Sequence, residues 1–454
     1  MTTKADIVII GAGLTGLTIA YYLKKAGRNF ILIEKESRAG GVINTVSENG
    51  FIYESGPNTG VLSTPEIALL FEDLKDRCIL ETANPKAAKR YILKNGSWTP
   101  LPSGPLSAIK TPLFSLNDKF RILAEPFRKR GTDPDETVAQ LVRRRLGKSY
   151  LDYAVNPFVS GIYAGDPEKL VTRFALPKLY ALEHNYGSFI RGALAKARET
   201  KTDDEKKATR EVFSVAGGLS NLINALVTEI GTERIITGYG NTVISRTTQG
   251  YKVTAGNDPA SSNEYEASVV ITTAAGYSLP SILPFVPVET MRNISELQYA
   301  RVVQVSLGYK TWNGKELDAF GGLVPEAEKR EILGVLFPSV IFKDRAPENG
   351  ALLSVFLGGI KRPDIIEKDD REIRIAVLKE IKDTLFCTKY PELIRINRYM
   401  HAIPQYDKDS EARLASINKI QEDNPGLILA GNIRDGIGMA DRVKQGKTIA
   451  MMFK

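Results

Sequence analysis

Three glycines near the start of the chain have the spacing of a phosphate-binding turn. Gly11, Gly13 and Gly16 follow the apolar run 7–10 and open a helix-like run that ends near Gly27. Gly11 permits a tight turn, Gly13 lets the backbone approach a pyrophosphate, and Gly16 lets the helix pack closely on the strand. Phosphates would then lie at a helix N-terminus, where free N–H groups favour negative charge. The sequence therefore predicts a dinucleotide site with these contacts: Gly11, Ala12, Gly13, Leu14, Thr15 and Gly16.

A carboxylate stands where the ribose of such a dinucleotide would need it. The second expected strand ends on Glu34, which lies 18 residues after Gly16. There a carboxylate can accept both hydrogen bonds from an adenosine ribose. Residues 38–41 follow as an Arg-x-Gly-Gly run, which is similar to the pattern of flavoprotein oxidases. We therefore interpret the dinucleotide as FAD rather than NAD.

Two later segments fit contacts to a flavin ring. Residues 56–59, Gly-Pro-Asn-Thr, predict a turn, which in flavoproteins of this type lies near the isoalloxazine ring. Residues 427–430 predict a strand, and the glycine loop 431–439 then leads into a final helix whose N-terminus can point at the ring. A second GxGxxG is missing, because 238–240 lacks the third glycine. A pyridine-nucleotide reductase would need that site, so electrons are expected to leave to oxygen or another acceptor.

Composition narrows the remaining chemistry. The chain has 454 residues, which is too long for one core and predicts two or three domains. Its only cysteines and histidines are Cys78, Cys387, His184 and His401, so a disulfide framework, a metal site and a Ser-His-Asp triad are not expected. No apolar run reaches the roughly 18 residues of a membrane-spanning helix. The first strand begins almost at once, so no signal peptide is expected, and a reducing cytoplasmic setting fits.

Positive charge is concentrated in one segment. The chain has 61 Lys and Arg against 53 Asp and Glu, and residues 85–150 alone have 14 against 5. An anionic partner is indicated: acidic lipid, an acidic small molecule or nucleic acid, although no nucleic-acid module is found. Leu116, Phe120, Leu123 and Phe127 recur at helical spacing within this segment. This apolar stripe with basic flanks fits either an anionic membrane surface or a helix that faces the core.

The order of the expected elements indicates an α/β protein with three parts. A Rossmann-like FAD-binding domain, a substrate-binding domain with an antiparallel sheet, and a helical, basic domain are predicted. Within the helical part, the prolines at 157, 167 and 177 are expected to interrupt helices. The predicted FAD-binding domain comprises 1–80, 211–294 and 406–454, and the substrate-binding domain comprises 81–110 and 295–405. The helical domain comprises 111–210.

Beyond these motifs, the chain resembles the FAD-dependent protoporphyrinogen oxidases and their relatives, the coproporphyrinogen III oxidases, which have the amine oxidase-like flavoprotein fold. The resemblance rests on the order and spacing of these stretches: 54–59, 101–104, 158–167, 213–219, 320–325, 403–406 and the C-terminal glycine loop. It implies removal of six electrons from a porphyrinogen, in three hydride transfers to FAD. Oxygen would reoxidise the flavin with release of peroxide, and the helical domain would bind a membrane.

The resemblance also assigns site residues. Phe320, Leu323 and Phe356 would clamp the porphyrinogen disc, and Gly161 would offer its backbone carbonyl to the pyrrole N–H groups. No catalytic side chain is predicted, because the flavin carries the chemistry. The FAD contacts that it implies beyond the first glycine turn are Glu34, Lys35, Arg38, Gly41, Val42, Gly56, Pro57, Asn58, Thr59, Val243, Gly431, Asp435, Ile437, Gly438 and Met439.

The partner of the substrate carboxylates is left open by the resemblance. Leu106 stands where animal and plant members carry an arginine that pairs with a propionate. Lys110 or Arg90 would have to take that role here. Protoporphyrinogen and coproporphyrinogen differ by two carboxylates, so the choice between them stays open as well.

The predicted function is FAD-dependent oxidation of protoporphyrinogen IX to protoporphyrin IX in haem biosynthesis, with coproporphyrinogen III oxidation as the alternative. An amine oxidase is a further alternative, although those usually read Arg-x-Gly-Gly-Arg and Val42 follows the glycines here. A carotenoid desaturase-like enzyme and a non-enzymatic scaffold of the Rab escort type are weaker alternatives. Expected partners are the porphyrinogen, oxygen or another acceptor, and an anionic membrane surface. A homodimer, and binding to the inner face of the cytoplasmic membrane by an otherwise cytoplasmic protein, are left open.

Overall fold

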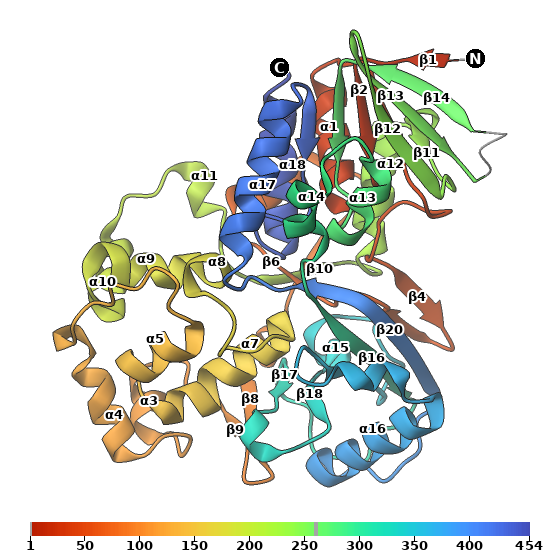
Figure 1. Cartoon of the computed structure of the whole chain (residues 1–454). Coiled ribbons are helices and arrows are strands. Elements are labelled where there is room, and N and C mark those ends of the chain that lie inside the picture. Colours follow the sequence, from red (N-terminus) through yellow and green to blue (C-terminus); the bar gives the residue numbers. More distant parts are fainter. Residues whose placement is uncertain (1, 258–261) are drawn as a thin grey trace.

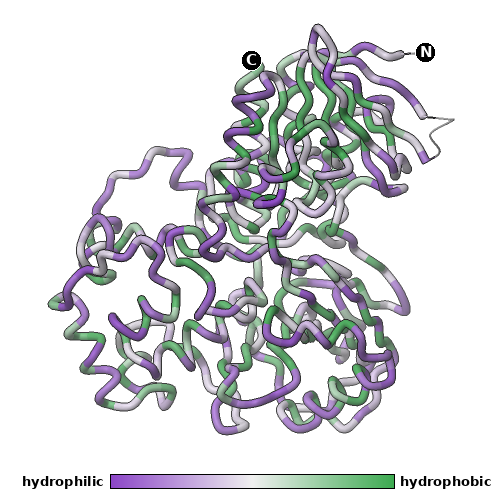
Figure 2. The backbone as a smooth tube through the Cα atoms, in the orientation of Figure 1, coloured by the Kyte–Doolittle hydropathy of each residue, from purple (hydrophilic) through white to green (hydrophobic). Residues whose placement is uncertain are grey.

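The computed structural model describes residues 2–257 and 262–454. A parallel sheet flanked by helices lies next to both chain ends, a larger sheet lies below it, and short helices gather at one side (Figure 1). Hydrophobic residues concentrate along the strands of the upper sheet (Figure 2). This mixed arrangement confirms the predicted α/β class.

The parallel sheet has the order β11–β3–β2–β15–β21. All four residues of its central strand β2 are buried, which is typical of a parallel strand covered on both faces. The glycine turn and Glu34 follow directly after β2 and β3, so both lie at the carboxyl edge of the sheet. The strands are β2 (Ile7–Ile10), β3 (Phe30–Ile33), β11 (Ile235–Ile236), β15 (Val269–Thr272) and β21 (Leu427–Leu429).

Each face of this sheet has its own core. Ile7 and Ile9 pack with the helices of one layer, α1 (Leu14–Lys25), α2 (Pro65–Asp73), α12 (Ser220–Ile230) and α18 (Met439–Met451). Val8 and Ile10 pack on the opposite layer. That layer contains β1 (Thr2–Lys4), β12 (Asn241–Thr247), β13 (Gly250–Gly256), β14 (Asn263–Ala267), η6 (Gly276–Ser278), α13 (Leu279–Ile282), α14 (Val288–Ser295) and α17 (Ser410–Asp423). The short η4 (Thr232–Arg234) joins α12 to β11.

Two small sheets connect the upper and lower parts. β4 (Thr45–Glu48) and β5 (Phe51–Glu54) form a hairpin. β10 (Val212–Val215) lies between β6 (Gly60–Val61) and β7 (Leu80–Thr82), antiparallel to both.

The lower sheet has seven strands in the order β20–β16–β19–β18–β17–β8–β9. Its β8–β17 pair is parallel and its other pairs are antiparallel. The long helix α16 (Asp370–Leu385) covers one face, where Val377 packs with Val305 and Val355. The elements are β8 (Arg90–Lys94), β9 (Ser97–Pro100), β16 (Tyr299–Tyr309), β17 (Gly321–Leu323), β18 (Ile332–Leu336), β19 (Ala351–Gly358), β20 (Leu393–Pro404), η1 (Pro85–Ala87), η7 (Glu326–Glu328), α15 (Pro338–Ile341) and η8 (Pro363–Glu367).

The helical part runs from α3 to α11. Its elements are α3 (Pro105–Lys110), α4 (Leu116–Leu123), η2 (Glu125–Phe127), α5 (Val138–Arg145), α6 (Lys148–Tyr150), the π-helix η3 (Leu151–Val155), α7 (Asn156–Tyr163), α8 (Thr172–Ala175), α9 (Pro177–Tyr186), α10 (Phe189–Arg198) and α11 (Asp203–Lys206). The expected interruption at Pro157 is wrong, because α6, η3 and α7 follow one another without a break. The π-helix η3 directly precedes Pro157, which stands in the first turn of α7, so the proline is accommodated where the helix geometry changes.

The apolar stripe of this helical part does not face the core. Leu116, Phe120, Leu123 and Phe127 are 67 to 84% exposed, which contradicts the core-facing alternative. Within the described residues, no helix is both long and apolar enough to cross a membrane. The shared sheet of β8, β9 and β16–β20 supports grouping 81–110 with 295–405, and the domain boundaries themselves stay predictions.

Candidate functional site: a dinucleotide cradle and an apolar wall

The first glycine turn is as tight as its spacing predicts. Gly11 has φ +98°, which favours glycine. A Cβ added at Gly16 would lie 1.9 Å from the carbonyl oxygen of Gly11, so α1 can approach β2 only with glycine there. Around Gly13, the N-cap of α1, an added Cβ would meet no protein atom within 4 Å. The turn therefore leaves open space at the position predicted for a pyrophosphate.

Glu34 is held beside this turn by backbone N–H groups. Its side chain is buried, and its carboxylate accepts hydrogen bonds from the N–H groups of Ala12 (2.7 Å) and Glu36 (3.0 Å). Gly238 and Tyr239 donate backbone N–H groups to the carbonyls of Glu36 and Glu34. These two residues lead into β12, which carries the half-exposed Val243. The predicted ribose acid is thus fixed at the edge of the cradle.

The Arg-x-Gly-Gly loop lies against the turn. The Arg38 guanidinium donates to the carbonyls of Gly41 (2.8 Å) and Ile43 (2.9 Å), which folds the loop on itself. A Cβ on Gly41 would lie 3.3 Å from the Cα of Gly13. Lys35 forms only an exposed ion pair with its neighbour Glu36, and Val42 is largely exposed.

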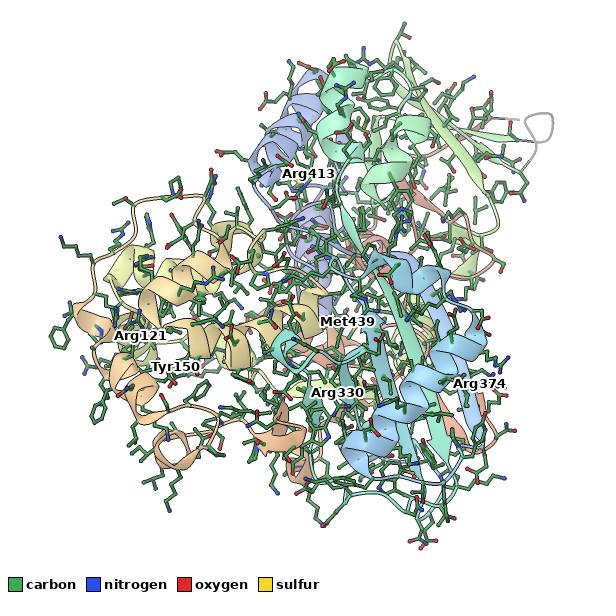
Figure 3. All side chains as sticks on the ribbon, turned by 60° about the horizontal axis from the view of Figure 1, so that its bottom comes forward. Arg121, Tyr150, Arg330, Arg374, Arg413 and Met439 are labelled. Atoms are coloured by element: carbon green, nitrogen blue, oxygen red, sulfur yellow. The ribbon has the colours of Figure 1, made fainter. Side chains whose placement is uncertain are left out.

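The turn 56–59 packs on that loop and on the end of the chain. A Cβ on Gly56 would lie 1.9 Å from the Val42 carbonyl oxygen, and one on Gly60 would lie 2.7 Å from Cε of Met439. The buried Asn58 donates from Nδ2 to the carbonyl of Gly56 at 3.2 Å. Figure 3 shows Met439 near the centre of the molecule. Segments 11–16, 38–42, 56–59 and 431–439 therefore lie against one another and form one continuous cradle around the position predicted for the dinucleotide.

An apolar wall stands on the face of the lower sheet opposite α16. Leu323 pairs with Gly334, Gly334 with Phe356, and Phe356 with Gln304 across β17, β18, β19 and β16. Paired residues of neighbouring strands share one face. The helix α7 covers this face, and a Cβ on Gly161 would lie 2.4 Å from Cδ2 of Leu323. The structure therefore brings Gly161, Leu323 and Phe356 to one wall.

Phe320 lies at the margin of this wall. It packs with Ile341 and Phe342, whereas Leu323 and Phe356 belong to other apolar clusters. The Arg90 guanidinium lies over the Phe320 ring, 5.2 Å from its centroid. In the pairing of β8 with β17, Ile92 lies opposite the wall residue Leu323, and Arg90 is two residues before Ile92. Since every second side chain of a strand is on the same face, Arg90 is also on the wall face.

Residues 14–451 match the model of the family described as flavin containing amine oxidoreductase. The chain belongs to the flavin-containing amine oxidoreductases. Its dinucleotide cofactor is therefore FAD, and the chain is an oxidoreductase enzyme.

Among members of this family, the chain is 30% identical to the mitochondrial protoporphyrinogen oxidase of Nicotiana tabacum, over 97% of this chain and 93% of that protein. It is 26% identical to the coproporphyrinogen III oxidase of Bacillus subtilis, over 98% and 97%. A crystal structure from Exiguobacterium sp. 255-15 covers 100% of this chain and 99% of its own, with a TM-score of 0.81 at 23% identity. The last likeness shows the shared fold.

The flavin-oxidoreductase cradle has supports that the sequence did not reveal. The hydroxyl of Tyr406 lies 3.1 Å from the carbonyl of Asn432 and 3.0 Å from that of Gly436, and burial raises its pKa, so it stays a donor. On α18, Arg442 donates to the carbonyl of Asp435, and Gln445 donates to its carboxylate at 2.8 Å. Asp435 itself has φ +62°. These side chains shape the C-terminal loop, and no glycine pattern points to them.

Two wall residues were also missed. Leu336 pairs with Gly321 and Ser354 and is half-buried on the wall face. Leu333 reaches the same side through an irregularity in the β18–β19 pairing, and it packs with the cluster that contains Ala164. Only sheet register, which a single sequence does not reveal, assigns these two positions.

Ile437, a predicted FAD contact, is partly buried and packs against the apolar cluster of the helical part.

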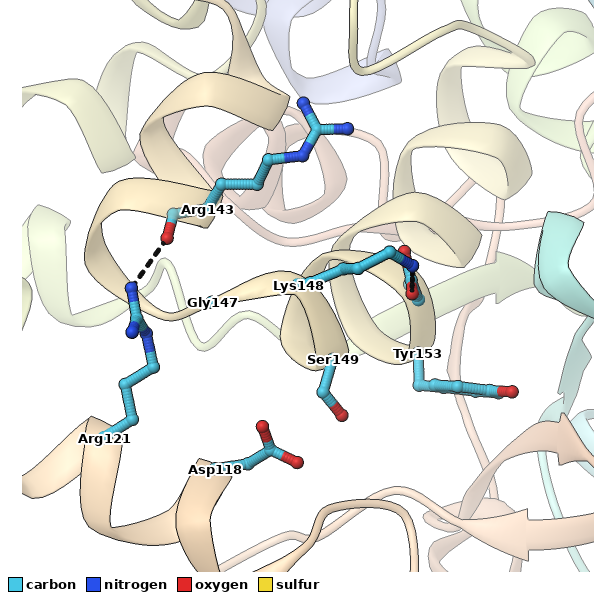
Figure 4. A pocket seen from close by; sticks show the side chains of 8 residues that line it. Asp118, Arg121, Arg143, Gly147, Lys148, Ser149 and Tyr153 are labelled. Atoms are coloured by element: carbon cyan, nitrogen blue, oxygen red, sulfur yellow. Dashed lines mark hydrogen bonds and ion pairs between the residues drawn. The ribbon is translucent and has the colours of Figure 1, made fainter.

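A separate hollow of about 570 Å³ lies between α4 and α6 in the helical part (Figure 4). Its cations are already engaged: Arg121 donates to the carbonyl of Arg143 at 3.0 Å, and Lys148 pairs with Asp152. The guanidinium of Arg143 pairs with Glu168. Arg143 and Lys148 are therefore paired with carboxylates, whereas no ion pair engages Arg121 among the described residues. Among the described residues, no group of three or more His, Cys, Asp and Glu could hold a metal ion.

Proposed function

We propose that this enzyme oxidises protoporphyrinogen IX to protoporphyrin IX, with coproporphyrinogen III as the alternative substrate. The observation that best supports this proposal is the contact of Gly161 with Leu323. This contact holds the end of α7 against the apolar wall beside the flavin cradle. The printed names of relatives that span nearly the whole chain support a porphyrinogen. Oxygen is the proposed acceptor, which would give peroxide.

The side chains of the site suit a flat, apolar substrate. Leu323, Leu336 and Phe356 present apolar groups that exclude water and hold the disc. Gly161 lies in the last turn of α7, whose carbonyls have no intrahelical partner, so its oxygen can accept from pyrrole N–H groups. When bound, FAD supplies the hydride acceptor for each of three two-electron rounds. Both histidines are exposed, so neither serves as a base within the wall.

Arg90 is the proposed partner of a substrate carboxylate, in preference to Lys110. Its neighbour Lys89 pairs with Asp318, whereas no ion pair engages Arg90 among the described residues. Lys110 ends α3, next to the exposed stripe. We expect Arg90→Met to raise KM about 10- to 100-fold, the effect of losing a hydrogen bond to a charged group. Lys110→Met is the matched control, and an equal rise in both variants would contradict this assignment.

A stopped-flow experiment without oxygen tests the substrate class. Protoporphyrinogen IX, coproporphyrinogen III and putrescine are each mixed with the oxidised enzyme, and the visible flavin absorption is followed. Fast loss of the absorption with a porphyrinogen and none with putrescine is expected. Loss with putrescine alone would favour the amine oxidase alternative.

We also propose that the helical part binds an anionic membrane surface, which would make the enzyme peripheral at the inner face of the cytoplasmic membrane. The exposed apolar stripe carries Leu116, Phe120, Leu123 and Phe127, and the exposed Leu106 and Ile109 extend it. Each such side chain contributes about 1.5–3 kcal/mol when it is buried. The cations of the same segment contribute about 1 kcal/mol each near acidic lipid. They include Lys110, Lys119, Arg128, Lys129 and Arg130.

Vesicle sedimentation tests the membrane proposal. Binding to phosphatidylglycerol vesicles should exceed binding to phosphatidylcholine vesicles and should weaken with salt. The double variant F120S/F127S should lose most binding. Phe386→Ser is the matched control, because Phe386 is equally exposed but lies at the end of α16. Equal binding by all variants would refute the proposal.

A further inference from the structure

A buried glutamine interrupts the apolar strand β16. Gln304 is 1% exposed, and its neighbours Val303 and Val305 pack on the opposite face, toward α16. Burying an amide is costly unless its polar atoms have partners. The Nε2 atom of Gln304 donates to the carbonyl of Glu54 at 2.8 Å and to Oγ of Ser354 at 3.0 Å.

These two partners belong to the two halves of the site. Glu54 is the last residue of β5, directly before the turn 56–59 of the FAD cradle. Ser354 is in β19, two residues before Phe356, and Phe356 itself pairs with Gln304. One side chain therefore joins the flavin turn to the strand that carries the apolar wall.

The end of β5 is fixed from its other side as well. The carboxylate of Glu54 accepts hydrogen bonds from the hydroxyl of Thr45 (2.8 Å) and from the N–H of Leu219 (2.9 Å). Those bonds tie Glu54 to the upper part of the molecule. The bond from Gln304 ties the same residue to the lower sheet. It acts beside other links between the two parts, such as the ion pair of Arg395 with Glu48, and it is the one that reaches the residue at the end of β5.

We propose that Gln304 is a positioning residue, which sets the distance between the flavin turn and the wall that holds the substrate. The inference rests on the proposed function for the identity of the substrate, but not for the effect on the flavin itself. Hydride transfer needs reacting atoms in close contact, and a displacement of about 1 Å can cost about 10²-fold in rate.

Three variants test the proposal. Gln304→Met keeps the shape and removes the donor, and Ser354→Ala removes one of the two partners with a smaller change. Ser306→Ala is the control, because Ser306 is on the same strand and face, is buried, and its Oγ has no hydrogen-bond partner among the described residues. FAD content, the flavin absorption spectrum, its reduction potential, kcat and KM are measured on each purified variant.

We expect Gln304→Met to keep FAD, to shift the flavin spectrum or potential, and to lower kcat about 10²-fold with KM changed less than about threefold. Ser354→Ala should change the same quantities in the same direction but less, and Ser306→Ala should match the wild type. Wild-type spectrum, potential and kcat in FAD-loaded Gln304→Met would overturn the proposal. If that variant does not fold, Ser354→Ala decides by the same readouts. If the wild type turns over no porphyrinogen, the proposed function fails, while the spectrum and potential still test Gln304.

Discussion

Replacing Gly13 by alanine would separate cofactor binding from folding at the first glycine turn. Gly13 caps α1 with φ −70° and ψ 178°, which alanine adopts without strain. An added Cβ would meet no protein atom within 4 Å. Alanine at a helix N-cap costs about 0.5–2 kcal/mol relative to the best caps, and glycine costs only a few tenths, so the free energy of unfolding should fall by about 1 kcal/mol and by no more than about 2 kcal/mol.

The same methyl group would occupy the space through which a pyrophosphate reaches the backbone. Losing one hydrogen bond to a charged group costs about 1.5–3 kcal/mol. That is about a 10- to 150-fold rise in the Kd for FAD. The assay titrates apo-protein with FAD and follows quenching of flavin fluorescence, while the unfolding temperature of the apo-protein is measured in parallel.

Two matched glycine variants complete this experiment. Gly104 also has open space around an added Cβ but lies far along the chain, before α3, so Gly104→Ala should bind FAD normally. Gly16→Ala would place a methyl 1.9 Å from the Gly11 carbonyl, so it should lose about 3 kcal/mol of stability through overpacking. Wild-type affinity in Gly13→Ala would refute the assignment of the pyrophosphate position.

Three further predictions concern the wall and the helical part. Phe356→Ala should raise KM for the porphyrinogen about tenfold and leave FAD content unchanged; lost FAD would contradict a role confined to substrate. Arg145→Met should destabilise the helical part by about 3–5 kcal/mol, measured by urea unfolding, because it leaves the buried carboxylate of Glu125 unpaired; an unchanged midpoint would contradict this. Burial acts to raise the pKa of Glu183, but hydrogen bonds, chiefly from Arg144, outweigh it and hold the pKa below its usual value. Its contribution to stability is therefore present above the unfolded pKa and should be lost as pH falls through the folded pKa, as followed by thermal unfolding at a series of pH values.

The local sequence was sufficient to predict the cradle, but it was not sufficient to predict the wall. The glycine turn and Glu34 lie within one strand-helix-strand unit, so spacing alone predicts their arrangement. Leu336 and Gln304 join the site only through the register of β16, β18 and β19. Those strands pair over long sequence separations, and a single sequence carries no direct signal of register.

The apolar stripe shows a different limit of prediction from sequence. Helical spacing of Leu116, Phe120 and Leu123 is the same whether the side chains meet a core or a lipid surface. Only the packing of neighbouring elements decides between these two environments. In the structure, no part of the chain within 2–257 and 262–454 covers the stripe, so its side chains are largely exposed. The tyrosine and arginine supports of the C-terminal loop were missed for a related reason, because each acts through a backbone carbonyl, and any residue type at the accepting position offers one.

The most direct test of the central claim is aerobic turnover of purified enzyme on protoporphyrinogen IX and coproporphyrinogen III, side by side. Porphyrin fluorescence and peroxide are followed together. We predict that porphyrin appears with about three peroxide molecules for each macrocycle, as six-electron oxidation with oxygen as acceptor requires, and that protoporphyrinogen is preferred. Preference for coproporphyrinogen would favour the alternative substrate. No porphyrin from either substrate, with FAD bound, would contradict the proposed function.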